Sequence, residues 1–410
     1  MSALRYGVLC ALILLTGCAS YQVETEKARK EMIESPAEAA TRLEPLAKEE
    51  GKDQLLYMLN YATALQLAGR NAESAKEFIA AEKVADLKDY HSVSRVAGSL
   101  LLSEEVVQYK GDDFEKVLIN GMNAMNYLEM GELDDALVEV RRVNDKLMKL
   151  KVDGKKEFNQ SPFAFYLGAM IWEADRKYDD AYISYKQAYE VAPNYRPLRE
   201  DLIRAAIKAQ RPEELETWRK AFPEVQIKPE WKDRNRGEVV LVFANGWGPR
   251  KYPRFDNHRF PQLVAGFTPV SSATLSVFPA GNKDVQPIAT TSTASIYSVN
   301  DVAIKALEAD YARLVASRIA GAVTKAVVAD QLRQKNELLG AVAWIALSVS
   351  DRADLRQWST LPATFQIARA SVNPGKYTVR LKANGSAEEK TVDVEVKPGR
   401  KAFLVWRVLD

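Results

Sequence analysis

The chain has 410 residues, with 57 Lys and Arg against 55 Asp and Glu. This near-neutral balance gives no basis for nucleic-acid binding or for a polybasic membrane patch. Two histidines and two cysteines are too few for a His/Cys metal site.

The N-terminus is typical of a secretory signal peptide at residues 1–17. Arg5 supplies a positive charge, and an apolar run follows that is too short to span a bilayer. Leu15, Thr16 and Gly17 then precede Cys18, in the pattern of a bacterial lipobox. We therefore expect cleavage before Cys18 and lipid attachment to its thiol. The alternative is an ordinary signal peptide with a chance cysteine.

The residues around the predicted cleavage site also bear on location. Ala19 follows Cys18, where an Asp would favour retention in the inner membrane. The sequence thus predicts a protein held in the outer membrane by its acyl chains, palmitate among them, and facing the periplasm. Cys10 leaves with the signal peptide, so we expect no disulfide in the mature body.

Residues 18–222 are rich in Ala, Leu, Glu and Lys, and their apolar residues recur at helical spacing. Three stretches resemble tetratricopeptide (TPR) hairpins, in which small residues allow helices to approach and aromatic residues fill the space between hairpins. The residues that carry this pattern are Ala62, Leu65, Gly69, Phe78 and Ala81; Ala124, Tyr127, Gly131 and Ala136; and Ala169, Trp172, Tyr178, Ala181, Tyr185, Ala188 and Pro193.

The repeat is irregular. Gly69 and Gly131 are 62 residues apart instead of one 34-residue TPR period, so an extra helix at about residues 93–108 is predicted between them. An irregular α-bundle is the alternative interpretation. TPR arrays commonly bind extended segments of partners along a concave face, and the resemblance implies such a face here.

Residues 223–236 are polar and charged and are predicted to be a linker, after which strands begin. Period-two alternation and turn signals predict an antiparallel β-sandwich-like domain over residues 237–410. The expected strands are residues 237–244, 273–278, 294–299, 363–370, 376–383, 390–396 and 401–408. The fold class is therefore α+β multidomain.

A helical insertion is predicted at about residues 302–349. Ile304, Leu307, Tyr311, Leu314, Ile319 and Val323 fall close to one stripe of a helix. Docking of this stripe on the sheet is favoured over pairing with a partner helix. The apolar run 338–349 is too short to cross a membrane; a buried helix is favoured over a segment that dips into the bilayer surface.

Two clusters are candidates for binding. One combines Asp354, Arg356 and Trp358, and the other is a glycine-containing loop with Trp247, Arg250 and Lys251. In the functional interpretation they contact a partner, and the basic loop suits an anionic glycan. In the structural interpretation, which is favoured, Asp354 pairs with Arg356 and the Trp358 ring covers the sheet.

No motif points to catalysis. The sequence has no Walker A loop, no GxGxxG after a strand and no nucleophile elbow near His91 or His258. We expect no enzymatic activity, no cofactor and no metal, although an Asp/Glu pair acting as a hydrolase is an alternative.

Four segments resemble a family of uncharacterised bacterial outer-membrane lipoproteins with a TPR-like half and a C-terminal β domain. They are residues 109–117, residues 124–128 with 136–142, residues 246–251 and residues 353–362. The resemblance implies the same architecture, and partners among cell-envelope proteins, including other small lipoproteins. It supplies no activity.

Together these observations predict a lipid-anchored, periplasm-facing scaffold that binds other envelope proteins. The alternatives are a module that binds peptidoglycan or another glycan, and a carboxylate-dependent hydrolase.

Overall fold

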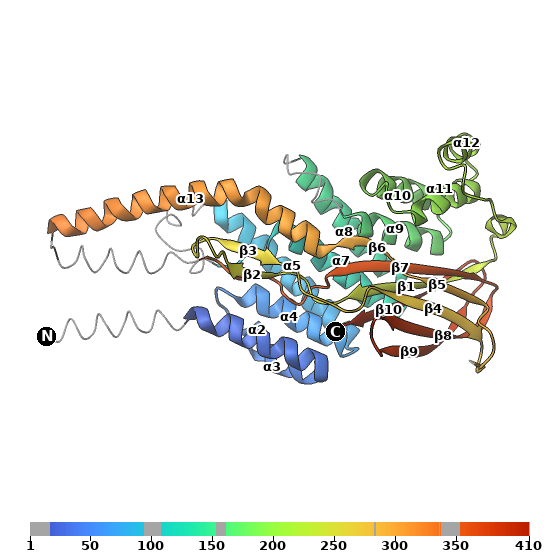
Figure 1. The fold of residues 1–410 in the computed structure, drawn as a ribbon, viewed down its shortest axis with the longest axis horizontal. Coiled ribbons are helices and arrows are strands. Elements are labelled where there is room, and N and C mark those ends of the chain that lie inside the picture. The colour runs from blue at the N-terminus through green and yellow to red at the C-terminus, as the bar shows by residue number, and fades with distance from the viewer. Residues whose placement is uncertain are drawn as a thin grey trace. The chain divides into compact units, whose positions relative to one another are not determined.

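The computed structural model describes residues 17–93, 108–152, 161–282, 284–335, 337 and 353–409. Their contacts divide the chain into two compact units, each assembled from separate stretches of sequence (Figure 1). Unit 1 contains the described residues of Met1–Lys116, Pro249–Ala265 and Ala303–Thr360, and unit 2 contains those of Val117–Gly248, Gly266–Val302 and Leu361–Asp410. The predicted domain boundaries stay a prediction.

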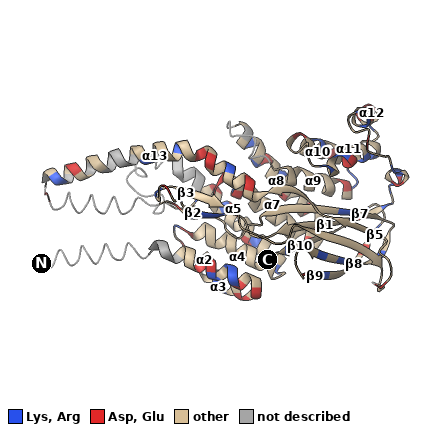
Figure 2. Ribbon diagram, viewed as in Figure 1, with Lys and Arg blue, Asp and Glu red and all other residues tan. Residues whose placement is uncertain are grey.

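Unit 1 is built on consecutive helices that pack one against the next. They are α2 (Gly17–Glu34), α3 (Pro36–Lys48), α4 (Gln54–Leu67) and α5 (Asn71–Val93). Figure 2 shows charges of both signs along α3, and Glu38, Arg42 and Lys48 among them are exposed. The first turn of α7 (Asp113–Met130), a hairpin of β2 (Arg250–Pro253) and β3 (Pro261–Val264), and most of α13 (Val299–Lys335) complete the unit.

Unit 2 contains the rest of the helical hairpins. After α7 come α8 (Leu133–Val152), α9 (Pro162–Ala174), α10 (Tyr178–Val191), α11 (Pro197–Lys208) and α12 (Pro212–Ala221). Gly168 allows close approach of α9 to α8, since a Cβ there would lie 2.7 Å from Val140 Cγ1. The three predicted hairpins are confirmed as α4–α5, α7–α8 and α9–α10, and α11–α12 forms one more that the pattern did not reveal.

The same turn joins the helices in all four hairpins. Residues 69, 131, 176 and 210 each have a left-handed backbone, with φ of 74°, 76°, 62° and 56°. In each case the residue's N–H donates to the carbonyl three residues back, and the next N–H donates to the carbonyl five back. This is the Schellman motif. The last two turns are 34 residues apart, the TPR period.

The strands of unit 2 form two four-stranded sheets packed face to face. The first has the order β10-β1-β7-β6 and the second the order β5-β4-β8-β9. Their bounds are β1 (Gly237–Asn245), β4 (Ser272–Pro279), β5 (Ala289–Ser292), β6 (Ala294–Ser298), β7 (Thr364–Val372), β8 (Gly375–Asn384), β9 (Glu389–Val396) and β10 (Lys401–Val408). Apolar residues of both sheets, among them Phe243 and Leu381, share one buried core. All the predicted strands are present, and the sandwich is mixed because β1 and β10 run parallel.

The structure adds detail to two predicted segments, the linker and the helical insertion. The linker region contains a short 3₁₀ helix, η2 (Pro229–Lys232), whose Trp231 is buried. In α13, Tyr311 of the predicted stripe packs on the β2–β3 hairpin, where it meets the ring of Phe260 and the guanidinium of Arg254. Ile319 is exposed. The expected helix at 93–108 and the run 338–349 fall outside the described residues, except at residues 93 and 108.

Candidate functional site

The structure brings four of the six predicted binding residues together in unit 1. Lys251, Asp354, Arg356 and Trp358 meet where residues 353–360 cross helices α2, α4 and α5 as an irregular segment. We call residues 353–360 the clasped segment. Its polar and apolar side chains are largely buried, with Arg356 7% and Trp358 2% exposed.

Trp358 is the apolar anchor of the clasped segment. Its ring packs against Phe78 of α5, with 5.7 Å between centroids. Its indole N–H donates to the hydroxyls of Thr63 and Thr360, at 3.2 and 3.0 Å. The expectation that this ring covers a sheet is therefore corrected: the ring packs on a helix, and a hydroxyl of α4 satisfies the buried indole N–H.

Helix side chains also hold the main chain of the clasped segment. The Tyr21 hydroxyl donates to the Gln357 carbonyl at 2.7 Å, and Arg29 donates to the Ser359 carbonyl at 2.7 Å. The Trp358 N–H donates to Glu115 Oε1 at 2.7 Å. The segment is thus held through its backbone as well as its side chains.

Arg356 lies among acceptors. It donates to Asp354 at 2.7 Å and to Asp53 at 3.1 Å, and its guanidinium lies 5.4 Å from the centre of the Tyr109 ring. Burial alone would lower the pKa of Arg356, but the hydrogen bonds with Asp354 and Asp53 raise it above its usual value. The predicted Asp354–Arg356 pair is present, and Arg356 remains a cation.

Lys251 and Glu115 complete this polar centre. Lys251 Nζ lies 3.0 Å from Asp112 and donates to the Arg356 carbonyl at 3.1 Å. Glu115, 1% exposed, also accepts from the Tyr109 hydroxyl. Burial, reinforced by the charge of Asp112, raises the pKa of Glu115 to about 7.

The other two predicted residues lie elsewhere. Arg250, on β2, forms an ion pair of 2.5 Å with Glu26 of α2. Trp247 belongs to unit 2, where the Arg407 guanidinium lies 5.0 Å from the centre of its ring. That these six residues bind a partner stays a prediction.

Unit 2 contains a second buried polar cluster, where helices α9 and α11 meet β1, β7 and β10. We call it the ionic cluster. Its charged members are Glu173, Asp201, Arg204, Lys208, Glu238, Arg369 and Lys401. Sequence reasoning missed this cluster, although one signal existed: Glu238 and Arg369 are charged positions inside strands that are otherwise apolar.

Arg369 is the centre of the ionic cluster. It lies 2.7 Å from Asp201, 3.0 Å from Glu173 and 2.7 Å from Glu238. Burial alone would raise the pKa of Glu173, but nearby cations, Arg204 first, hold it well below its usual range. Glu173 is therefore ionised, and the cations of the same cluster match its charge.

Both clusters lie on the same kind of helical face. Helices α4, α9 and α11 are the first helices of their hairpins, and the concave surface of a TPR-like array is built from such helices. In unit 1 the clasped segment covers α4, and in unit 2 the β1–β7–β10 surface covers α9 and α11, where Phe163 also stacks on Phe365 at 4.3 Å. The chain itself occupies the face expected to receive a partner.

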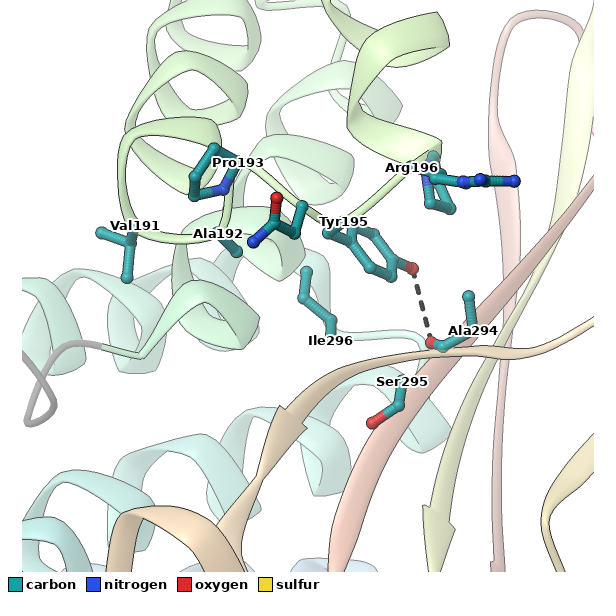
Figure 3. A pocket seen from close by; sticks show the side chains of 10 residues that line it. Val191, Ala192, Pro193, Tyr195, Arg196, Ala294, Ser295 and Ile296 are labelled. Carbon is teal, nitrogen blue, oxygen red and sulfur yellow. Dashed lines mark hydrogen bonds between the residues drawn. The ribbon is translucent and has the colours of Figure 1, made fainter. Parts of the chain in front are cut away.

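Unit 2 also has a shallow surface pocket of about 480 Å³. Residues 191–197, from the end of α10 to the start of α11, and residues 294–296 of β6 line it (Figure 3). The Tyr195 hydroxyl donates to the Ala294 carbonyl at 3.5 Å across it. Its lining contains no carboxylate and no histidine, so this pocket offers no acid–base pair.

In the part of the chain that the structure describes, no helix combines the length and apolar character needed to cross a bilayer. In the same residues, no group of His, Cys, Asp or Glu could hold a metal ion. Cys18 is the second residue of α2.

The chain matches no family model and no curated protein. Among solved structures it is similar to a candidate kinesin light chain of Podosopora anserina with nearly identical TPR-like repeats, at 13% identity and a TM-score of 0.35 over 51% of this chain and 96% of that one. A form of the same protein with one substitution gives 12% and 0.34, over 50% and 92%. BtubC (BKLC) from P. vanneervenii gives 16% and 0.30, over 55% and 86%. The TPR-like character of the helices rests on their own hairpin geometry.

Proposed function

We propose that the protein is a lipid-anchored scaffold of the bacterial cell envelope, facing the periplasm from the outer membrane and binding other envelope proteins. The observation that carries the binding role is the clasped segment. Tyr21 of α2, Thr63 of α4 and Asp53 just before α4 hold this irregular stretch of chain by a carbonyl, its indole and its guanidinium. Hairpins with this capability suit protein–protein interaction.

The anchor is supported by the sequence. Leu15, Thr16, Gly17 and Cys18 fit a lipobox, and Ala19 favours the outer membrane. Lipidation with more than one acyl chain gives stable attachment. A soluble Cys18→Ala form found in the periplasm, with the wild type in the outer membrane fraction, would support this part of the proposal.

Because the chain covers its own inner helical faces, we place partner binding on the outer helices. Met148 and Val152 of α8 are exposed large apolar side chains one turn apart, and Ile183 of α10 is another. None of the residues of α12 is buried. Exposed apolar residues at helical spacing are typical of a surface that another protein covers.

The test is affinity capture from detergent-solubilised envelopes. The bait is the intact protein, compared with a Met148→Asp, Val152→Asp variant and with a matched Ile288→Asp control, whose residue is exposed and lies beside strand β4. We expect a defined set of envelope proteins with wild type and control, and its loss with the α8 variant. Equal capture by all three would contradict the placement of the binding surface on α8. If no envelope protein is captured specifically, the scaffold function is contradicted.

The geometry does not favour the two alternatives. Glycan binding through the basic loop would need surface cations, whereas Lys251 is buried and Arg250 is paired with Glu26. A hydrolase would need a carboxylate pair open to substrate, whereas Glu173 and Glu238 are buried among cations. Equal sedimentation with peptidoglycan of wild type and an Arg250→Ala, Lys251→Ala, Arg356→Ala variant would argue against the glycan module.

A further inference from the structure

We propose that the loop of the β2–β3 hairpin inserts into the surface of the bilayer that holds the lipid anchor, with Phe255 as the inserted side chain. This inference rests on the proposed function, because it requires the acyl chains on Cys18. It adds a second contact with the membrane, which the anchor alone does not supply.

The loop has the composition of a membrane contact. Phe255 is 94% exposed, which is unusual for so large an apolar side chain. Tyr252 and Val264, on the two strands, are exposed as well. Arg254 is neutralised by Asp256 at 2.9 Å. An aromatic ring beside arginine and tyrosine is typical of the membrane–water interface, where the ring enters the apolar region and the polar groups stay at headgroup level.

The hairpin is tied to the helix that carries the anchor. Arg250 at the start of β2 forms its ion pair with Glu26, and α2 begins at Gly17. Glu26 lies eight positions after Cys18 in the helix, about 12 Å along the axis. Phe255 lies five positions after Arg250, a reach of at most about 18 Å. Cys18 and Phe255 therefore lie at comparable distances from the Arg250–Glu26 ion pair.

The start of α2 and the hairpin loop lie toward one side of unit 1. In Figure 1 the hairpin loop and the first turn of α2, all within unit 1, lie on the same side of α3 and α4. The loop is also braced, because the rings of Phe260 and Tyr311 pack together at 5.4 Å and Arg254 lies over the Tyr311 ring at 5.0 Å. A braced loop beside the anchor can enter a bilayer without refolding.

The experiment uses the full-length, lipidated chain with one introduced cysteine. With Cys18 acylated and Cys10 removed with the signal peptide, Phe255→Cys supplies the sole free thiol of the mature protein. An environment-sensitive fluorophore is attached there, and the protein is reconstituted into vesicles of phosphatidylethanolamine and phosphatidylglycerol that contain spin-labelled lipid. The matched control is Glu34→Cys, an exposed position at the other end of α2, about 24 Å from Cys18 along the helix.

We expect a blue-shifted emission and a loss of fluorescence by the spin label at position 255, with neither at position 34. If the protein floats with the vesicles but position 255 behaves like position 34, the anchor stands and the insertion is overturned. If mass spectrometry shows Cys18 without acyl chains and the protein does not float, the anchor fails and the insertion fails with it.

Discussion

Glu115 is almost fully buried, yet it receives hydrogen bonds from the Tyr109 hydroxyl and the Trp358 N–H. Burial raises its pKa from 4.5 to about 7. Between these two values the folded chain binds more protons than the unfolded chain, so this contribution to stability is present at low pH and is lost as the pH rises through 7.

A Glu115→Gln variant should therefore lose this part of the pH dependence. The difference between the urea midpoints of variant and wild type should favour the variant more at pH 8 than at pH 5. At pH 8 the wild type buries a charged carboxylate, which the neutral amide avoids. Urea titrations of both proteins at the two pH values measure the change. If the variant differed from wild type by the same amount at both pH values, the pKa of Glu115 would not be raised.

The ring of Trp358 packs against Phe78 of α5, and Thr63 satisfies its indole N–H. Trp358→Ala should lower the free energy of unfolding by about 3–5 kcal/mol, since it leaves a cavity. Trp358→Phe should lose less, about 1–3 kcal/mol, because a smaller aromatic ring still fills part of the space while the indole hydrogen bonds go. Denaturant unfolding compares the two, and similar small losses would mean that the segment is loosely held.

At this scale the sequence allowed a partial prediction of the site. Asp354, Arg356 and Trp358 were selected because charged and aromatic residues lie together in one short run, and the Asp354–Arg356 pair is confirmed. Their partners Tyr109 and Glu115 lie in the segment 109–117, which carries part of the family resemblance, but nothing local links it to residues 353–362. Spacing along the chain does not report a contact across more than 240 residues.

Among the elements, the four Schellman turns differ in one respect. Gly69 and Gly131 occupy the left-handed position in two of them, whereas Arg176 and Gln210 occupy it in the others. A side chain with a Cβ is strained there by roughly 1–2 kcal/mol. Arg176 also donates to the Pro398 carbonyl at 2.6 Å, which gives that side chain a second role.

Gln210→Gly should stabilise the fold. The relief of strain exceeds the added freedom of the unfolded chain, for a net gain of about 0.5–1 kcal/mol. The matched reverse change, Gly131→Gln, should destabilise by about 1–2 kcal/mol, because nothing lies within 4 Å of a Cβ there and only the backbone conformation matters. Thermal unfolding measures both variants. If the two changes shifted the unfolding temperature in the same direction, backbone strain at this position would not be the cause.

The ionic cluster joins helices α9 and α11 to strands β1, β7 and β10. Removing one partner from such a cluster leaves opposite charges buried and unmatched, so Arg369→Gln should cost about 3–5 kcal/mol. Arg380→Gln is the control, since Arg380 on β8 pairs with the half-exposed Glu389; it should cost less than about 1 kcal/mol. If denaturant unfolding shows the same loss of free energy for both variants, the buried cluster contributes no more than the surface ion pair.

Elements with strong periodicity were predictable, and their arrangement was less so. The strands at 376–383 and 401–408 follow from alternation and turn signals. Parallel pairing of β1 with β10 does not, because sheet order depends on long-range contacts. The β2–β3 hairpin was missed since prolines and charges fill residues 250–264 and hide the alternation.

At the scale of the whole molecule, each unit draws on both halves of the sequence. A fragment of residues 18–236 would lack the clasped segment over α4 and the β strands over α9 and α11. Phe78, Thr63 and Phe163 would then face water. We expect such a fragment to bind 8-anilinonaphthalene-1-sulfonate and to unfold without a sharp transition. Cooperative unfolding like that of the intact chain would contradict this.

The same interleaving bears on the time at which the chain can fold. Asp53 meets Arg356 across 303 residues of sequence, and Tyr21 meets Gln357 across 336. At roughly 5–20 residues per second of synthesis, helix α4 exists for about 15–60 s before the segment that covers it has been made. During that interval the slot for Trp358 stands open, so the early helices are exposed to chaperones, proteases and other chains for as long as the end of the protein is still to come.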